Sequence, residues 1–215
     1  MPYRRLPNTD AARLRALKIS NEKGKEIPPF KLAFSQSNLQ KIKSFLSLFE
    51  KSMLESKQAY QKQVEKSKEY NQVLKKARLY ISHFIQVINM AIMRGDLPSK
   101  EKEYYGLHDS GKLPPLNTEA DIIKWGEKLI HGETVRTMQG HSPITNPTIA
   151  VVKVRYEKFL EAYKFQKMLQ KNSQRAQERL DELRLQANDI IVDVWNEIEK
   201  SFEKRTRKYI PPKKW

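Results

Sequence analysis

The chain has 215 residues, of which 39% are hydrophobic and 31% charged, and its formal net charge is +16 at pH 7. This balance is too apolar for a disordered chain and too charged for a membrane-embedded one. No run approaches the roughly 18 apolar residues that a membrane span requires, and the absence of cysteine excludes disulfides and thiolate sites. We expect a cytoplasmic protein without a secretory signal, whose positive field attracts polyanions or acidic protein surfaces.

Residues 1–30 predict an N-terminal arm and a short helix. Asn8, Thr9 or Asp10 can cap this helix, and Gly24, a helix breaker, predicts that it ends before that residue. Its apolar positions are Ala11, Leu14, Leu17 and Ile19.

We predict one long helix over residues 36–94, because neither proline nor glycine occurs between Pro29 and Gly95. Two rows of residues repeat every seven positions, which is typical of packed helices. Both rows are apolar at their ends and polar in the middle. The first row is Leu46, Met53, Tyr60, Ser67, Leu74, Ile81 and Ile88, and the second is Ile42, Phe49, Ser56, Gln63, Tyr70, Ala77, Phe84 and Ala91.

Residues 95–147 predict a connector, because glycine and proline are concentrated there. Gly95 is expected to supply a left-handed C-cap to the preceding helix. A helix is expected to open at Thr118, which forms a capping-box pattern with Asp121. The segment Gly106–Lys112 fits the phosphate-binding pattern GxxxxGK, but Leu113 stands where a P-loop needs a hydroxyl for Mg²⁺. We therefore interpret it as a turn-rich loop.

Residues 148–208 predict a second long helix, since no proline or glycine occurs between Pro147 and Pro211. Its middle is again polar. One apolar stripe is Ile149, Val152, Tyr156, Phe159 and Tyr163, and the other is Leu180, Leu183, Ala187, Ile190, Val194 and Ile198.

The predicted fold is therefore all-α, with residues 1–215 forming a single helical domain. We favour an elongated antiparallel bundle built on two long helices with short accessory helices. The alternative is a four-helix bundle, in which both long segments break at their polar middles, near Asn71 and near Asn172–Ser173.

Candidate catalytic and metal-binding groups are scarce. The four histidines are His83, His108, His131 and His141, and no two have the spacing of a metal site. We interpret His83, within the apolar run Tyr80–Met93, as a partly buried structural imidazole. We expect no cofactor, no metal and, in the absence of an acid–base or nucleophile constellation, no enzyme activity.

Basic and aromatic residues gather at the two ends, where cations next to stacking rings suit sequence-independent binding of polyanions. The alternative interpretation of the segment 209–215 and its neighbours is a solvated tail. The candidate polyanion-binding residues are Arg4, Arg5, Lys204, Arg205, Arg207, Lys208, Lys213, Lys214 and Trp215.

Four segments, at residues 1–10, 77–92, 146–154 and 194–202, resemble an uncharacterised family of Bacteroidetes proteins with no known function. The resemblance spans nearly the whole chain and implies one domain, but it implies no activity and no site residues.

We expect a non-catalytic binding or scaffolding protein whose partner is another protein with an acidic surface. The alternative is a sequence-independent nucleic-acid-associated protein acting through its basic ends and helix faces. Cations spread around the helices would favour the first function, and a one-sided basic stripe would favour the second. We expect no membrane partner, and the sequence leaves the oligomeric state open.

Overall fold

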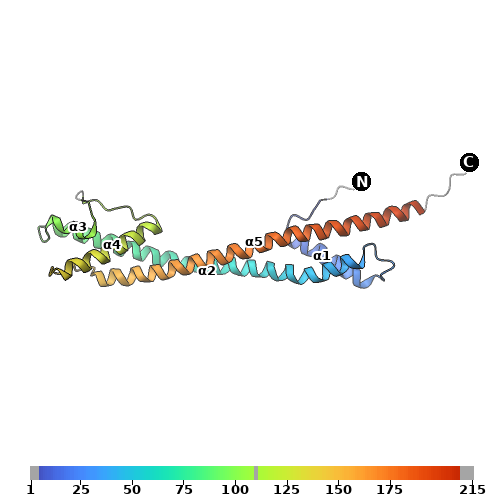
Figure 1. Ribbon diagram of the computed structural model, residues 1–215, viewed down its shortest axis with the longest axis horizontal. Coiled ribbons are helices and arrows are strands. Elements are labelled where there is room, and N and C mark those ends of the chain that lie inside the picture. The colour runs from blue at the N-terminus through green and yellow to red at the C-terminus, as the bar shows by residue number, and fades with distance from the viewer. Residues whose placement is uncertain (1–4, 109–110, 209–215) are drawn as a thin grey trace, which may run out of the picture. The chain divides into compact units, whose positions relative to one another are not determined.

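The computed structural model describes residues 5–108 and 111–208, with residues 204–208 described by their backbone alone. Every element of regular secondary structure in these ranges is helical (Figure 1), which confirms the all-α prediction. The elements are α1 (Asp10–Glu26), α2 (Gln36–Met93), the 3₁₀ helix η1 (Ser99–Glu101), α3 (Lys102–Tyr105), α4 (Glu119–Met138) and α5 (Ile149–Lys208). No helix in these ranges combines the length and the apolar character that crossing a bilayer requires.

The two long helices continue through their polar middles, so the predicted alternative of breaks near Asn71 and Asn172–Ser173 is wrong. One polar pair forms across the bundle in this region. The Ser56 hydroxyl donates a hydrogen bond to Oε1 of Gln177 at 3.2 Å. Because the middle contains polar residues but no glycine or proline, the backbone keeps its helical hydrogen bonds there.

The contacts divide the chain into two compact units, which are described one at a time. The first comprises residues 1–61 and 171–215 and contains α1 with the N-terminal part of α2 and the C-terminal part of α5. Its core is a cluster of buried apolar side chains from all three helices and from Phe34, just before α2. The buried members are Leu17, Phe34, Leu39, Ile42, Phe45, Phe49, Leu180, Leu183, Ala187, Ile191 and Val194.

Helix α1 begins at the cap Thr9, whose hydroxyl accepts a hydrogen bond from the backbone N–H of Ala12. The helix then continues through Gly24 to Glu26, so the prediction that it ends before Gly24 is wrong. The physical reason is packing: a Cβ at Gly24 would lie 2.3 Å from a methyl carbon of Leu39. The glycine therefore allows close approach between α1 and α2.

Two polar contacts hold segments that are far apart in sequence within this unit. Nη2 of Arg184 on α5 lies 2.6 Å from a carboxylate oxygen of Asp10 on α1. The backbone N–H of Ser35, just before α2, donates to Oε2 of Glu197 on α5 at 2.7 Å. Glu197 therefore binds one of the free N–H groups at the start of α2, where negative charge is favourable.

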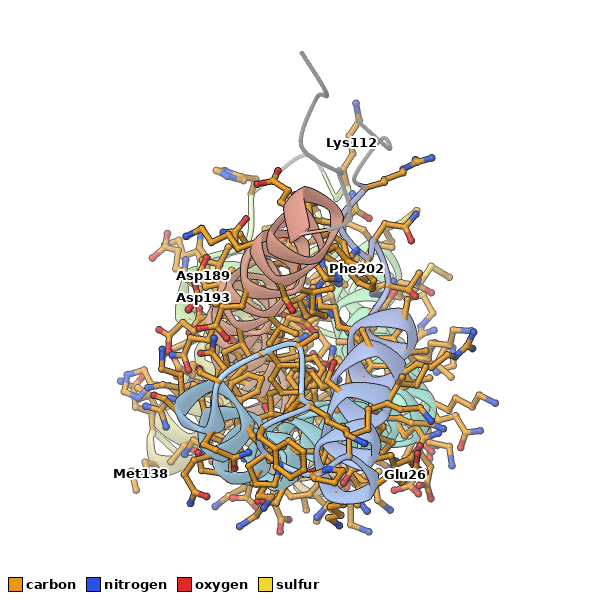
Figure 2. The ribbon with its side chains drawn as sticks, turned by 90° about the vertical axis from the view of Figure 1, so that its right-hand side faces the viewer. Glu26, Lys112, Met138, Asp189, Asp193 and Phe202 are labelled. Carbon is orange, nitrogen blue, oxygen red and sulfur yellow. The ribbon has the colours of Figure 1, made fainter. Side chains whose placement is uncertain are left out.

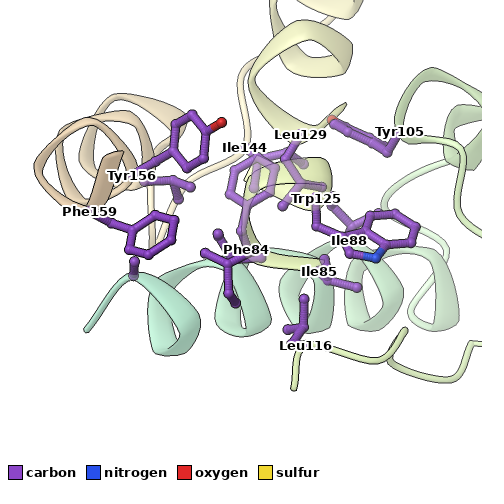
Figure 3. Close-up of a cluster of buried hydrophobic side chains, with 14 of the residues drawn as sticks. Phe84, Ile85, Ile88, Tyr105, Leu116, Trp125, Leu129, Ile144, Tyr156 and Phe159 are labelled. Carbon is purple, nitrogen blue, oxygen red and sulfur yellow. The ribbon is translucent and has the colours of Figure 1, made fainter. Parts of the chain in front are cut away.

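The second unit comprises residues 62–170, and α4 packs there on the α2 and α5 segments (Figure 3). Of the two heptad rows, the one that contains Tyr70, Ala77 and Phe84 is the more deeply buried. The buried cluster consists of Tyr70, Ala77, Ile81, Phe84, Ile85, Ile88, Tyr105, Leu116, Ile122, Trp125, Leu129, Ile144, Val152, Tyr156 and Phe159.

The connector follows the sequence prediction in its turns. Gly95 has a φ of +81° directly after α2, as expected of a left-handed C-cap, and Gly106 ends α3 with a φ of +62°. In the GxxxxGK segment, Leu107, His108, Gly111 and Lys112 adopt no regular secondary structure. The segment lacks the strand-to-helix context of a P-loop, in agreement with the interpretation as a loop.

Candidate functional site

The densest group of ionisable side chains in the described ranges lies where α4 meets η1 and α3. Helix α4 begins with the predicted capping box, in which Thr118 and Asp121 exchange side-chain and backbone hydrogen bonds. Gly132 allows α3 to approach α4 closely, because a Cβ at this position would lie 2.3 Å from the backbone oxygen of Tyr104. The missing side chain thus lets the segment with Glu101 and Tyr105 pack on the last turns of α4.

Arg136 is the centre of this group, and its side chain is fully buried. Its Nε and Nη2 donate to the two carboxylate oxygens of Glu133, one turn earlier on α4, at 2.9 and 3.1 Å. Its Nη1 donates to Oε2 of Glu101 at 2.8 Å, and Nη2 also donates to the backbone oxygen of Ser142 at 2.6 Å. One guanidinium therefore joins α4 to η1 and to the segment that leads into α5.

Glu133 is fully buried too and has two further donors. The Tyr105 hydroxyl donates to Oε2, and the backbone N–H of Ile144 donates to Oε1 at 2.7 Å. With the Arg136 contacts, both oxygens of this carboxylate are hydrogen-bonded. A buried carboxylate is tolerated when it is paired and hydrogen-bonded in this way.

The electrostatics agree with this geometry. Burial raises the pKa of Glu133, but hydrogen bonds from Arg136, Tyr105 and the Ile144 N–H outweigh it and hold the pKa below its ordinary value of 4.5. Burial and the hydrogen bond to Glu133 raise the pKa of Tyr105. The site is therefore ionised as a carboxylate–guanidinium pair next to a neutral phenol at neutral pH.

At the edge of this group, His141 lies next to the buried Glu101. Its Nδ1 is 3.1 Å from Oε1 of Glu101, while its side chain remains 39% exposed. The imidazole packs edge-on against the ring of Tyr104, with centroids 5.9 Å apart. These residues, with Lys100 and Glu103, line an open hollow of about 560 Å³.

The arrangement is suited to holding structure and to contact at the surface. Both carboxylates are committed to Arg136, and among the described residues no group of three histidine, aspartate or glutamate side chains could hold a metal ion. These groups face one another, and His141 at their edge is partly exposed.

His83 differs from its predicted environment. The interpretation as a partly buried imidazole is wrong, because His83 is exposed. It falls on the outward side of α2, where it lines a shallow hollow with Met90, Arg94 and Asn146. The apolar residues around it, such as Phe84 and Ile88, are buried because they lie on the inward side of α2. The prediction was wrong because it judged His83 by its neighbours in sequence and not by its side of the helix.

Most of the predicted polyanion-binding residues fall outside the part of the chain with described side chains. Arg5 is exposed. The backbone of Lys204, Arg205, Arg207 and Lys208 belongs to α5, which ends at Lys208. Arg4, Lys213, Lys214 and Trp215 lie outside the described residues, so the structure brings none of the predicted site residues together.

Sequence reasoning missed the Glu101–Glu133–Arg136 group altogether. One local signal was present, since Glu133 and Arg136 are three residues apart on a predicted helix and such pairs are neighbours. Nothing in the sequence indicated that this pair is buried, because burial depends on the return of residues 99–105 and 142–144 to the same place.

Comparison with known proteins adds no relationship: no family model matches the chain, and neither a curated protein nor a solved structure matches it.

Proposed function

We propose that this protein is a non-catalytic binding or scaffolding protein, whose partner is another protein with an acidic surface. The observation that carries the proposal is that its most deeply buried ionisable side chains are used internally. Glu101 and Glu133 both accept hydrogen bonds from Arg136, which also donates to the backbone, and so the three residues stabilise the second unit instead of facing a substrate.

The distribution of charge on α2 supports a protein partner over nucleic acid. Five of the seven heptad positions on this helix lie outside the two buried rows, and each of the five carries a lysine or arginine at least once along α2. The cations are therefore spread around the helix. A duplex or a single strand would instead be expected to meet a one-sided basic stripe. The cations are Lys41, Lys43, Lys51, Lys57, Lys62, Lys66, Lys68, Lys75, Lys76 and Arg78.

One observation keeps nucleic-acid binding as the second candidate function. Helix α5 continues to Lys208, so four predicted polyanion-binding residues lie on its last two turns, where the chain is strongly basic. Short-range pairing of such cations with phosphates needs no sequence-specific site.

Affinity capture with the full-length chain tests the two functions against each other. The tagged protein is incubated with native lysate, with and without a nuclease that degrades DNA and RNA, and captured proteins are identified by mass spectrometry. A partner that is retained after nuclease treatment and is released by about 500 mM salt supports an acidic protein surface. A set of captured proteins that disappears entirely after nuclease treatment contradicts the proposal and favours nucleic acid. A chain that lacks residues 204–215 is the matched control, because it removes the basic end without touching either described core.

A further inference from the structure

The C-terminal part of α2 has an outward face with one lysine, Lys76, and several large apolar side chains but no carboxylate. Neither aspartate nor glutamate occurs from Tyr70 to Gly95. Positions three and four residues apart share one face of a helix, and every residue of this row is exposed. The row, called the α2 face below, consists of Lys76, Leu79, His83, Gln86, Met90 and Met93.

Its apolar members are open to solvent. The exposed fractions are 54% for Leu79, 50% for Met90 and 80% for Met93. The N-terminal continuation of the same row along α2 is different. It carries both positive and negative charges and only one large apolar residue. Those earlier positions are Lys41, Ser44, Leu48, Lys51, Glu55, Gln58, Lys62, Glu65 and Glu69.

The α2 face is also hollowed on one flank. His83, Gln86 and Met90 line an indentation of about 420 Å³ together with Thr145 and Asn146. Methionine side chains are flexible and polarisable, and they are common at surfaces that receive a partner. A helix with one projecting apolar side chain and flanking carboxylates is complementary to such a surface.

A face of that description occurs on α5 of the same chain. Neither lysine nor arginine occurs from Leu185 to Glu199. Glu182, Leu185, Asp189 and Asp193 are exposed and lie three or four residues apart, with Leu185 67% exposed among the three carboxylates. Figure 2 shows Asp189 and Asp193 next to one another at the surface of α5. We call these four residues the α5 face.

We propose that the α5 face of one copy of this protein docks on the α2 face of a second copy. The carboxylates of Glu182, Asp189 and Asp193 are opposite in charge to Lys76 and its neighbour Lys75, although Asp193 also lies 3.6 Å from Lys41 of its own chain. Leu185 lies about 6 Å or less along α5 from Glu182 and Asp189, and it covers Leu79, which lies about 4.5 Å along α2 from Lys76. The two faces are comparable in extent, at about 17 Å and about 26 Å, at 1.5 Å per residue. This inference goes beyond the proposed function, because it concerns the oligomeric state and does not depend on any other partner.

Two reciprocal charge reversals test the proposal by sedimentation velocity over a range of concentrations. One variant combines Lys75→Glu with Lys76→Glu, and the other combines Asp189→Lys with Asp193→Lys. Each reversal places like charges opposite one another in a self-complex. Each variant alone is expected to self-associate at least about tenfold more weakly than the unmodified chain.

The mixture of the two variants is the decisive measurement. The first variant then carries two negative faces and the second two positive faces, so an equimolar mixture is expected to associate more tightly than either variant alone. The unmodified chain is expected to dissociate as salt is raised from about 50 to about 500 mM, because exposed charges are screened.

Matched reversals at other exposed positions of the same helices are the controls. Lys57→Glu with Lys62→Glu, and Glu157→Lys with Glu161→Lys, are expected to leave self-association unchanged. Thermal melts confirm that every variant is folded. A monomeric unmodified chain at all concentrations in low salt overturns the proposal. So does equal weakening by the controls, or a mixture that fails to associate.

Discussion

Glu133 and Arg136 lie one turn apart on α4, and two nitrogens of the guanidinium face the two oxygens of the carboxylate at 2.9 and 3.1 Å. Both side chains are fully buried. A buried pair contributes little when compared with well-packed apolar residues, but removal of one partner leaves the other charge uncompensated. The pair therefore makes α4 sensitive to single substitutions that preserve its shape.

Glu133→Gln is expected to lower the free energy of unfolding by about 3–5 kcal/mol, because Arg136 then retains a buried charge with only Glu101 to neutralise it. Urea denaturation followed by circular dichroism measures the change. Glu157→Gln removes an exposed carboxylate with a 3.8 Å lysine neighbour and is the control, with an expected change within about 0.5 kcal/mol. Equal effects of the two substitutions would show that the buried network is not stabilising.

Stability is expected to decrease in acid through the same carboxylate. The pKa of Glu133 is lowered in the folded state from its ordinary value of 4.5. A group with a depressed folded pKa contributes stability above its unfolded pKa, and this contribution is lost as pH falls through the folded pKa. Unfolding free energies measured from pH 7 down to below 4.5 should therefore fall more steeply for the unmodified chain than for Glu133→Gln. Parallel curves would contradict this assignment.

Gly132→Ala is expected to destabilise the second unit, although alanine is favoured over glycine in a helix by about 1 kcal/mol. The new Cβ would lie 2.3 Å from the backbone oxygen of Tyr104, which moves only if the segment around α3 moves. Thr134→Ala, at an exposed position of α4, is the control and is expected to be nearly neutral. An increase in melting temperature for Gly132→Ala would refute the close-approach explanation.

The nucleic-acid alternative makes its own prediction for the basic end. If about five of its cations pair with duplex phosphates, counterion release gives a log–log salt slope of about −4.5, and affinity falls by about several hundredfold between 50 and 200 mM salt. Deletion of residues 204–215 is expected to flatten this slope by several units and to leave the melting temperature nearly unchanged. Fluorescence anisotropy with unrelated DNA and RNA oligonucleotides measures the affinity and its salt slope, and a thermal melt measures the melting temperature. No binding at 50 mM salt would eliminate this alternative, and an unchanged slope would place the site on the helix faces.

The sequence was sufficient to predict the long helices, because the absence of glycine and proline over more than 60 residues is a local signal. It also predicted the Thr118–Asp121 capping box and the Gly95 C-cap, which depend on residues close together in the chain. It was wrong at Gly24, where α1 continues to Glu26 and Leu39 from α2 packs closely against the glycine, a contact between residues far apart in the chain. It also missed the buried Arg136 group, whose members come from three separate places in the sequence, residues 101–105, 133–136 and 142–144.

The contact between Ser35 and Glu197 has a consequence for how the chain is made. Their sequence separation is 162 residues, and that of Asp10 and Arg184 is 174. Residues 62–170, by contrast, supply every member of their own core from one uninterrupted stretch. During synthesis from the N-terminus, the enclosed unit therefore has all its contacts available first. The apolar faces that α1 and early α2 present to α5 stay uncovered until residues 180–194 have left the ribosome.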